Sequence, residues 1–173
     1  MEPKKIIINL LNIFSWLVEL FIIYKAAFTA GTLGQLIFSS NYRTNFFNQE
    51  EMRLTNHTFT MVILNAVGEL LVAIAICVLL HYGRKLILNI KHDIFFTTQN
   101  LTIIRRLLIS FTTYTVLQIA TNYLASSPYE TRFSHLFSTK SNLPSIVSLG
   151  ILYLLYIIFK NGLTLQNDVD KMI

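Results

Sequence analysis

The sequence predicts an all-α, polytopic membrane protein with four transmembrane helices and with both ends on the inner side of the membrane. Hydrophobic residues make up 53% of the 173 residues, charged residues make up 13%, and the mean hydropathy is +0.53. A soluble domain carries about 25% charged residues, so a soluble globule is not expected. Four apolar stretches, which together form one transmembrane domain, are the expected spans: residues 6–28, 59–80, 107–124 and 144–160.

The first apolar stretch, residues 6–28, follows Lys4 and Lys5 and ends near a third lysine, Lys25. A helix of this length rises about 34 Å, which is enough to cross the hydrocarbon core of a bilayer. Tyr24 and Lys25 stand where a signal peptide would need small residues for cleavage. We therefore expect a retained membrane helix, with a lysine at its far end that can reach the lipid headgroups.

The second apolar stretch, residues 59–80, carries a single formal charge, Glu69, near its middle. A carboxylate at the centre of a membrane helix costs at least ~2.5 kcal/mol, so it should face protein or water rather than lipid. The basic run that starts at His81 is expected to end this span. The preceding residues 29–58 are expected to form a polar outer loop with a short surface helix around Asn48–Leu54.

The last two expected spans are residues 107–124 and 144–160, and the one charged residue in them is Lys160, at the end of the second. Pro144 falls at the start of the fourth span, where its missing N–H has no helical partner to lose. The segments outside the spans are expected to form an outer loop, an inner loop and an inner tail, at residues 125–143, 81–106 and 161–173.

The orientation follows from the distribution of lysine and arginine, which are retained preferentially on the inner side. With both ends inside, nine of the 14 basic residues are inner. They are Lys4, Lys5, Arg84, Lys85, Lys91, Arg105, Arg106, Lys160 and Lys171. The five outer ones are Lys25, Arg43, Arg53, Arg132 and Lys140. The nine-to-five ratio favours an N-in, C-in topology.

Polar residues inside the spans recur at helical spacing, which places them on one face of each helix. Glu19 and Glu69 would both lie roughly 21–22 Å from the inner surface if Lys5 and Arg84 mark that surface. We therefore expect a polar cluster near the membrane midplane. Its members are Asn12, Glu19, Asn65, Glu69 and Gln118.

Two interpretations of this midplane cluster stay open. In the first, the carboxyl and amide groups hydrogen-bond to one another and hold the helices together. In the second, they form a proton-coupled or cation-binding site, as intramembrane carboxyls often do. Two nearby carboxyls of similar depth would not both ionise. No cation is expected deep in a span, so no internal salt bridge is expected.

Other kinds of chemistry find little support in the residues. Cys77 is the single cysteine, the four histidines are scattered without metal-ligand spacing, and no phosphate-binding loop or nucleophile motif occurs. The basic residues are spread among loops, unlike a nucleic-acid footprint. We expect a non-enzymatic protein without cofactor or metal, with the lipid bilayer as its partner and no direct nucleic-acid binding.

Two motifs resemble those of the YoaS-like family of small bacterial integral membrane proteins. The entry to the third span resembles the family pattern F-T-x-x-N-x-x-x-L-R at Phe96, Thr97, Asn100, Arg105 and Arg106. The C-terminal run resembles G-x-x-L-Q-x-D-x-D-x-T-I at Gly162, Leu165, Gln166, Asp168, Asp170 and Ile173. The sequence departs from the family at Met172, where threonine is usual, and at Ile94-Phe95, where a proline is usual. Thr97 or Thr98 can cap a helix that begins near Gln99.

The resemblance implies a four-span protein of the bacterial cytoplasmic membrane without established chemistry. Members are often encoded beside a small helix-turn-helix regulator, which implies a membrane regulator or sensor that binds such a transcription factor. The expected cytoplasmic partner surface is Asn100, Arg105, Arg106, Gln166, Asp168 and Asp170. The two aspartates can dock on the two arginines, or the tail can remain solvated.

Rival functions are a small transporter, a bacteriocin-immunity-type protein that uses the midplane cluster, and an intramembrane enzyme, for which no catalytic constellation is visible. A homo-oligomer is left open.

Overall fold

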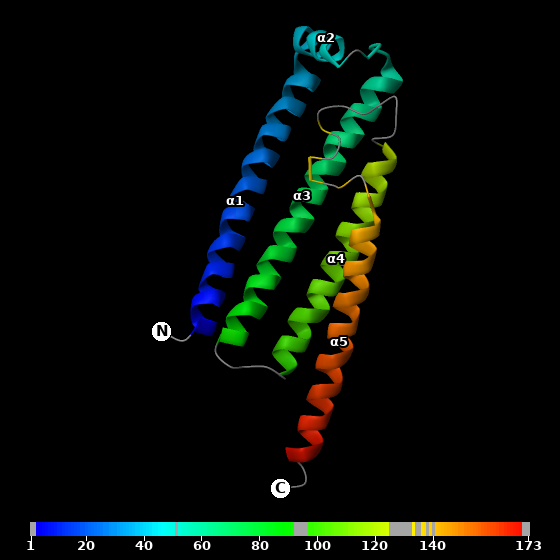
Figure 1. Ribbon diagram of the computed structural model, residues 1–173. Helices are drawn as coiled ribbons and strands as arrows, with labels where there is room; N and C mark the ends of the chain where they lie inside the picture. Colours follow the sequence, from blue (N-terminus) through cyan, green and yellow to red (C-terminus); the bar gives the residue numbers. More distant parts are fainter. Residues whose placement is uncertain are drawn as a thin grey trace. The chain divides into compact units, whose positions relative to one another are not determined.

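The computed structural model describes residues 3–50, 52–91, 97–124, 133, 136–137, 139 and 141–170. All regular secondary structure in these residues is helical, which confirms the all-α prediction. The five helices are α1 (Pro3–Phe38), α2 (Ser40–Gln49), α3 (Asn56–Lys91), α4 (Thr98–Leu124) and α5 (Leu143–Asp170) (Figure 1).

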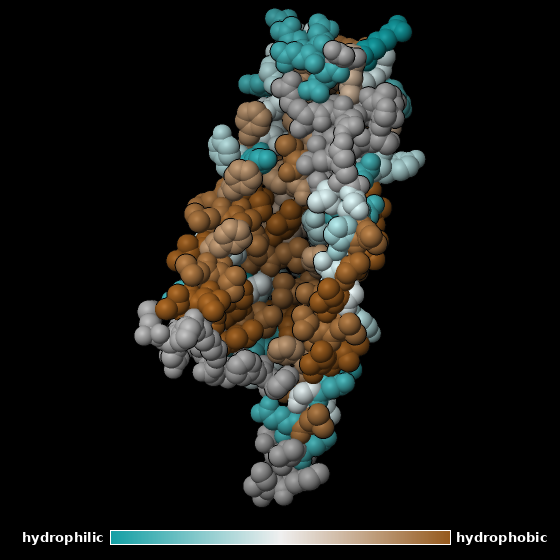
Figure 2. All heavy atoms as spheres, viewed as in Figure 1, coloured by the Kyte–Doolittle hydropathy of each residue, from teal (hydrophilic) through white to brown (hydrophobic). Residues whose placement is uncertain are grey.

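Three of these helices are long and apolar enough to cross a membrane: Ile6–Phe38, Asn56–Ile90 and Leu143–Gln166. Large apolar side chains along α1 stay exposed, for example Phe14 at 65% and Leu17 at 59%. Apolar residues cover most of the visible face of α1 and the middle of α5, whereas hydrophilic residues gather over α2 and toward the C-terminal end of α5 (Figure 2). Such extended apolar exposure is expected against lipid rather than water, so the membrane character of the chain is supported.

The fourth expected span corresponds to α4, which is not among the three helices apolar enough to cross a membrane in the described residues. Threonine, glutamine and asparagine dilute its hydropathy. Several of these polar side chains are buried, including Thr115, Gln118 and Thr121.

The expected outer loop at residues 29–58 is wrong in its detail. α1 continues ten residues beyond the expected end of the first span, to Phe38. The short helix lies at Ser40–Gln49 rather than Asn48–Leu54, and it buries Phe46 and Phe47. It begins because Ser39 leaves the helical conformation and its hydroxyl accepts a hydrogen bond from the Tyr42 N–H at 3.3 Å.

The expected end of the second span near His81 is also wrong, because α3 continues through Arg84 to Lys91. Most of the expected inner loop at residues 81–106 is therefore helical. α4 begins at Thr98, and the Thr97 hydroxyl accepts a hydrogen bond from the Asn100 N–H at 3.2 Å. The expected threonine cap is confirmed. The expected tail also begins as helix, since α5 reaches Asp170.

The chain divides into two compact units, and the long helices contribute to both. Unit 1 contains residues 1–19, 77–113 and 143–173, and unit 2 contains residues 20–76 and 114–142. Unit 1 therefore holds the first half of α1, the last part of α3, the first part of α4 and the whole of α5. Unit 2 holds α2, the remaining parts of α1, α3 and α4, and the segment that follows α4.

Unit 2 has an aromatic core built around α2. The Phe46 and Phe133 rings stack with their centroids 5.5 Å apart, and both side chains are almost fully buried. Leu36, Val62 and Ala66 complete the buried cluster. Burial of two phenylalanines contributes about 1.5–3 kcal/mol each, which explains why this nominally polar region folds.

Candidate functional site

The first carboxyl of the expected midplane cluster, Glu19, pairs with Arg84 inside unit 1. Glu19 Oε2 lies in direct contact with Arg84 Nη1, and the two side chains are only 15% and 8% exposed. The Arg84 guanidinium also lies over the Trp16 ring, 4.1 Å from its centroid. Because Trp16 is 53% exposed, its ring covers the outer face of the cation.

This ion pair corrects two expectations. An internal salt bridge was not expected, since Arg84 was assigned to the inner membrane surface. In the structure, Arg84 lies about 10 Å inside the end of α3 at Lys91, counted at 1.5 Å per residue. The Glu19 carboxylate, on α1, neutralises the Arg84 guanidinium, and a buried charge usually requires such a partner.

The second carboxyl, Glu69, lies in unit 2 and is fully buried. Its Oε2 accepts a hydrogen bond of 2.8 Å from the Phe137 N–H, in the segment between α4 and α5. Glu19 and Glu69 therefore belong to different units, and each has its own partner.

Gln118, on α4, binds the same connecting segment. Its Nε2 donates to Thr139 Oγ1 at 2.6 Å and lies within 3.2 Å of the Ser141 carbonyl oxygen. Asn122, one turn later, donates to the Thr139 carbonyl oxygen at 2.8 Å and to Asn142 Oδ1 at 2.7 Å. Together with Glu69, these side chains provide partners for the Phe137 N–H and for the Thr139 and Ser141 carbonyl oxygens, which such non-helical backbone groups need if they lie at membrane depth.

Two further members of the expected cluster differ in their surroundings. Asn12 is half-buried in unit 1, on the same face of α1 as Glu19. Asn65 is fully buried in unit 2, and within the described part of the chain neither its Oδ1 nor its Nδ2 has a hydrogen-bond partner. Asn65, Glu69 and Gln118 are fully buried and Asn12 is only partly buried, and the structure does not describe one cluster shared by all five residues.

The expected partner surface of unit 1 is only partly exposed. Asn100 is fully buried and its Oδ1 accepts a hydrogen bond from Asn89 Nδ2, so its assignment to a binding surface is wrong. It instead fixes the end of α3 to the start of α4. Phe96 and Ile173 of the two motifs lie outside the described residues, as does the side chain of Asp170.

The remaining members of that surface are exposed: Arg105, Arg106, Gln166 and Asp168. The Arg106 guanidinium lies 5.8 Å from the centroid of the Tyr82 ring. Within the described part of the chain, no ion pair joins Asp168 to Arg105 or Arg106. The expected docking of the aspartates is therefore not seen for Asp168, which lies near the end of α5.

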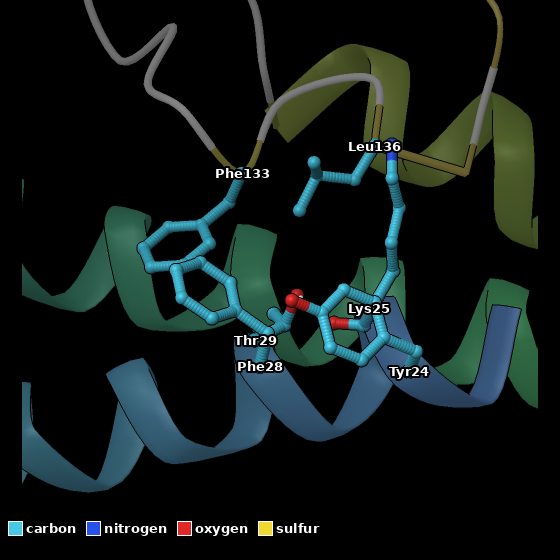
Figure 3. Close-up of a pocket in the computed structure, with 6 residues that line it drawn as sticks. All are labelled: Tyr24, Lys25, Phe28, Thr29, Phe133 and Leu136. Atoms are coloured by element: carbon cyan, nitrogen blue, oxygen red, sulfur yellow. The ribbon is translucent and has the colours of Figure 1, made fainter. Parts of the chain in front are cut away.

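A pocket in unit 2 was missed by the sequence analysis. It has a volume of about 300 Å³ and is lined by Tyr24, Lys25, Phe28, Thr29, Phe133 and Leu136 (Figure 3). The sequence offered one signal for this pocket, a lysine (Lys25) inside an apolar run. The walls of the pocket could not be predicted, because the contact between residues as distant in sequence as Phe28 and Phe133 is visible only in a structure. No group of three or more metal-binding side chains occurs in the portion that the structure describes.

No family model, curated protein or solved structure matches this chain. The resemblance to the YoaS-like family therefore remains a prediction that rests on its two motifs.

Proposed function

We propose that the chain is a non-enzymatic regulator or sensor of the bacterial cytoplasmic membrane that binds a cytoplasmic partner. A small helix-turn-helix transcription factor is the partner class that the family resemblance implies. The observation that carries the proposal is the division of charged groups in unit 1. Glu19 and Arg84 are buried against each other, whereas Arg105 and Asp168 are exposed and have no ion-pair partner among the described residues.

Charges in these two settings have different uses. A buried pair contributes to the fold, because neither ion can be left alone in a low-dielectric interior. An exposed, unpaired arginine contributes little to stability and is available to a partner, where arginine is enriched at interfaces. The exposed charges near the start of α4 and the end of α5 are therefore the best candidates for partner binding.

The proposal includes α4 as a fourth span, with both ends in the cytoplasm. Val116 and Ile119 point outward on the second half of this helix, while Gln118 between them is buried. The exposed Thr112 and Thr113 hydroxyls donate to the carbonyl oxygens four residues earlier, at 2.9 and 3.0 Å. These hydroxyls therefore need no partner from lipid.

The pairing of Arg84 with Glu19 modifies the argument for orientation without reversing it. Removing Arg84 from the nine expected inner basic residues leaves eight, against five expected outer ones. The remaining bias still favours an inner location for both ends.

A transporter or immunity-type protein is the second candidate, and the buried, unpartnered amide of Asn65 favours it. Asn65 lies one helical turn from Glu69, so a polar solute or proton path could involve both. The fixed hydrogen bond between Glu69 and Phe137 instead favours a structural role for the carboxyl. Glu69→Gln separates the two functions, because it would abolish proton-coupled transport but leave partner binding intact.

Crosslinking in native membranes, followed by affinity purification, tests the proposal. We expect a soluble DNA-binding protein to co-purify with the wild type and with Arg53→Ala, an exposed arginine on the expected outer side. Arg105→Ala/Arg106→Ala should lose it while remaining in the membrane. The proposal would be rejected if no soluble protein were captured, or if the double variant retained the partner in full.

A further inference from the structure

We propose that the pocket of unit 2 binds a single-chain carboxylate amphiphile, such as a medium-chain fatty acid, drawn from the surrounding bilayer. The proposal goes beyond the proposed function, since it concerns a ligand site in unit 2 and does not depend on a cytoplasmic partner. Four of its six lining residues come from α1 and two from the segment that follows α4 (Figure 3).

The walls of the pocket provide a preformed apolar surface. The Phe28 ring faces the Phe133 ring, and Leu136 closes the same side (Figure 3). Phe133 is only 1% exposed and stacks on Phe46, so its position is fixed by the aromatic core behind it. A ligand with a hydrocarbon body would gain about 25 cal/mol for each Å² of apolar surface that it buries here.

Among the described lining residues, Lys25 is the one that carries a charge. Its side chain extends from α1 across the pocket toward Leu136 (Figure 3). The ammonium lies 4.9 Å from the centroid of the Phe21 ring, and no carboxylate pairs with it among the described residues.

Thr29, one of the two hydroxyl-bearing residues of the wall with Tyr24, already donates its hydroxyl proton to the Lys25 carbonyl oxygen at 2.9 Å. A cation with three N–H donors in an apolar wall is best complemented by an anion that brings its own hydrocarbon part. The lining therefore selects an organic carboxylate over a neutral or cationic ligand.

The size of the pocket and the position of its opening further limit the class of ligand that it can bind. Ordinary ligand pockets measure about 300–1,000 Å³, and this one lies at the lower limit with about 300 Å³, so it suits one chain rather than a two-chain lipid. Tyr24 and Phe28 are 70% and 64% exposed, so the pocket opens on the outer face of α1.

The position of this opening favours a ligand from the bilayer. Lys25 lies 20 residues after Lys5 on α1, a rise of about 30 Å, which equals the thickness of the hydrocarbon core. The pocket would then lie at the far membrane interface, where a fatty acid presents its carboxylate.

Photocrosslinking with a diazirine derivative of decanoic acid tests this site in zwitterionic phosphatidylcholine nanodiscs. We expect crosslinks in the peptide that contains residues 24–29 or at Leu136. Excess decanoate should compete, whereas decyltrimethylammonium should not. Lys25→Met should lower the labelling of these residues about tenfold, the loss that corresponds to one charge-assisted contact of about 1.4 kcal/mol. Lys25→Arg should retain labelling, and Lys160→Met, an exposed lysine on α5, should leave it unchanged.

A second variant fills the pocket without removing the charge. Leu136→Trp should reduce labelling, whereas Leu154→Trp, at an exposed position of α5, should not. Leu136→Trp also tests whether the ligand occupies this pocket if Lys25→Met fails to fold. Equal labelling of wild type and Leu136→Trp, equal competition by the cationic and anionic amphiphiles, or crosslinks confined to other helices would each overturn the proposal.

Discussion

Single charged side chains show how the protein uses polar groups inside apolar helices. Arg84 is held between the Glu19 carboxylate and the Trp16 ring, so one residue neutralises the cation and another covers it. Glu69 accepts the backbone N–H of Phe137, which would otherwise have to find a partner elsewhere. Both carboxyls therefore stabilise specific local structures.

The Arg84–Glu19 pair should be needed for stability because removal of one partner leaves a buried, uncompensated charge. Glu19→Gln or Arg84→Met should destabilise the protein by about 3–5 kcal/mol. The double variant should recover part of this loss, since it leaves neither charge unpaired. Thermal unfolding in detergent measures the effect, and Arg105→Met, at an exposed arginine, provides the control. Additive losses in the double variant would show that the two side chains do not interact.

Glu69 should tolerate replacement by an amide but not by a cation. Glu69→Gln keeps a carbonyl oxygen that can accept the Phe137 N–H, so we expect a loss of no more than about 1 kcal/mol. Glu69→Lys places a buried cation against a donor and should prevent stable folding. The thermal stability of both variants, measured after solubilisation in detergent, tests this prediction. A Glu69→Lys variant as stable as the wild type would show that the side chain faces water.

At the scale of the helices, one set of contacts joins α2 to α1 and another brings α3 close to α4. α2 is held to the end of α1 because Arg43 Nε and Nη2 donate to the carbonyl oxygens of Leu36 and Ile37, at 3.0 and 2.8 Å. α3 and α4 approach closely in unit 2, where a Cβ atom added to Gly68 would clash with Thr121 Cγ2. Neither helix could come so near with a larger residue at position 68.

Gly68→Ala should therefore destabilise unit 2, by about 1–3 kcal/mol for overpacking, although alanine is the better helix former. Thr121→Ser removes the clashing methyl group but keeps the hydroxyl, so it should rescue Gly68→Ala. Gly150→Ala is the matched control, because nothing lies within 4 Å of a Cβ atom added there. If Gly68→Ala were as stable as Gly150→Ala, the close approach of α3 and α4 would be disproved.

The helical ends were the least predictable feature from the sequence, and each error has a physical cause. Arg84 looked like a boundary because an isolated arginine avoids the membrane interior, yet a partner from α1 allows α3 to continue to Lys91. Residues 29–58 looked like a polar loop because the burial of Phe46 against Phe133 depends on a contact distant in sequence. By contrast, the Thr97 cap was predictable because it is local.

At the scale of the whole molecule, composition and hydropathy were sufficient to predict an all-helical membrane protein. Four spans were predicted from the apolar runs, and three of them correspond to described helices that are long and apolar enough to span a membrane. The grouping of polar residues was less predictable. Glu19 and Glu69 were expected to share one site from their counted depths, but the count took Arg84 as a surface marker, and the two carboxyls belong to different units.

The number of spans can be tested most directly by asking on which side each end of the chain lies, because four spans place both ends on the same side and three place them on opposite sides. Glu2→Cys and Asp170→Cys, each in a Cys77→Ser background, would be treated in intact cells with a membrane-impermeant maleimide. Asn45→Cys, in α2 on the expected outer side, serves as the positive control. We predict that position 45 is labelled and that positions 2 and 170 are labelled only after the cells are opened. Labelling of position 170 but not position 2 in intact cells would contradict the four-span account and leave α4 outside the membrane.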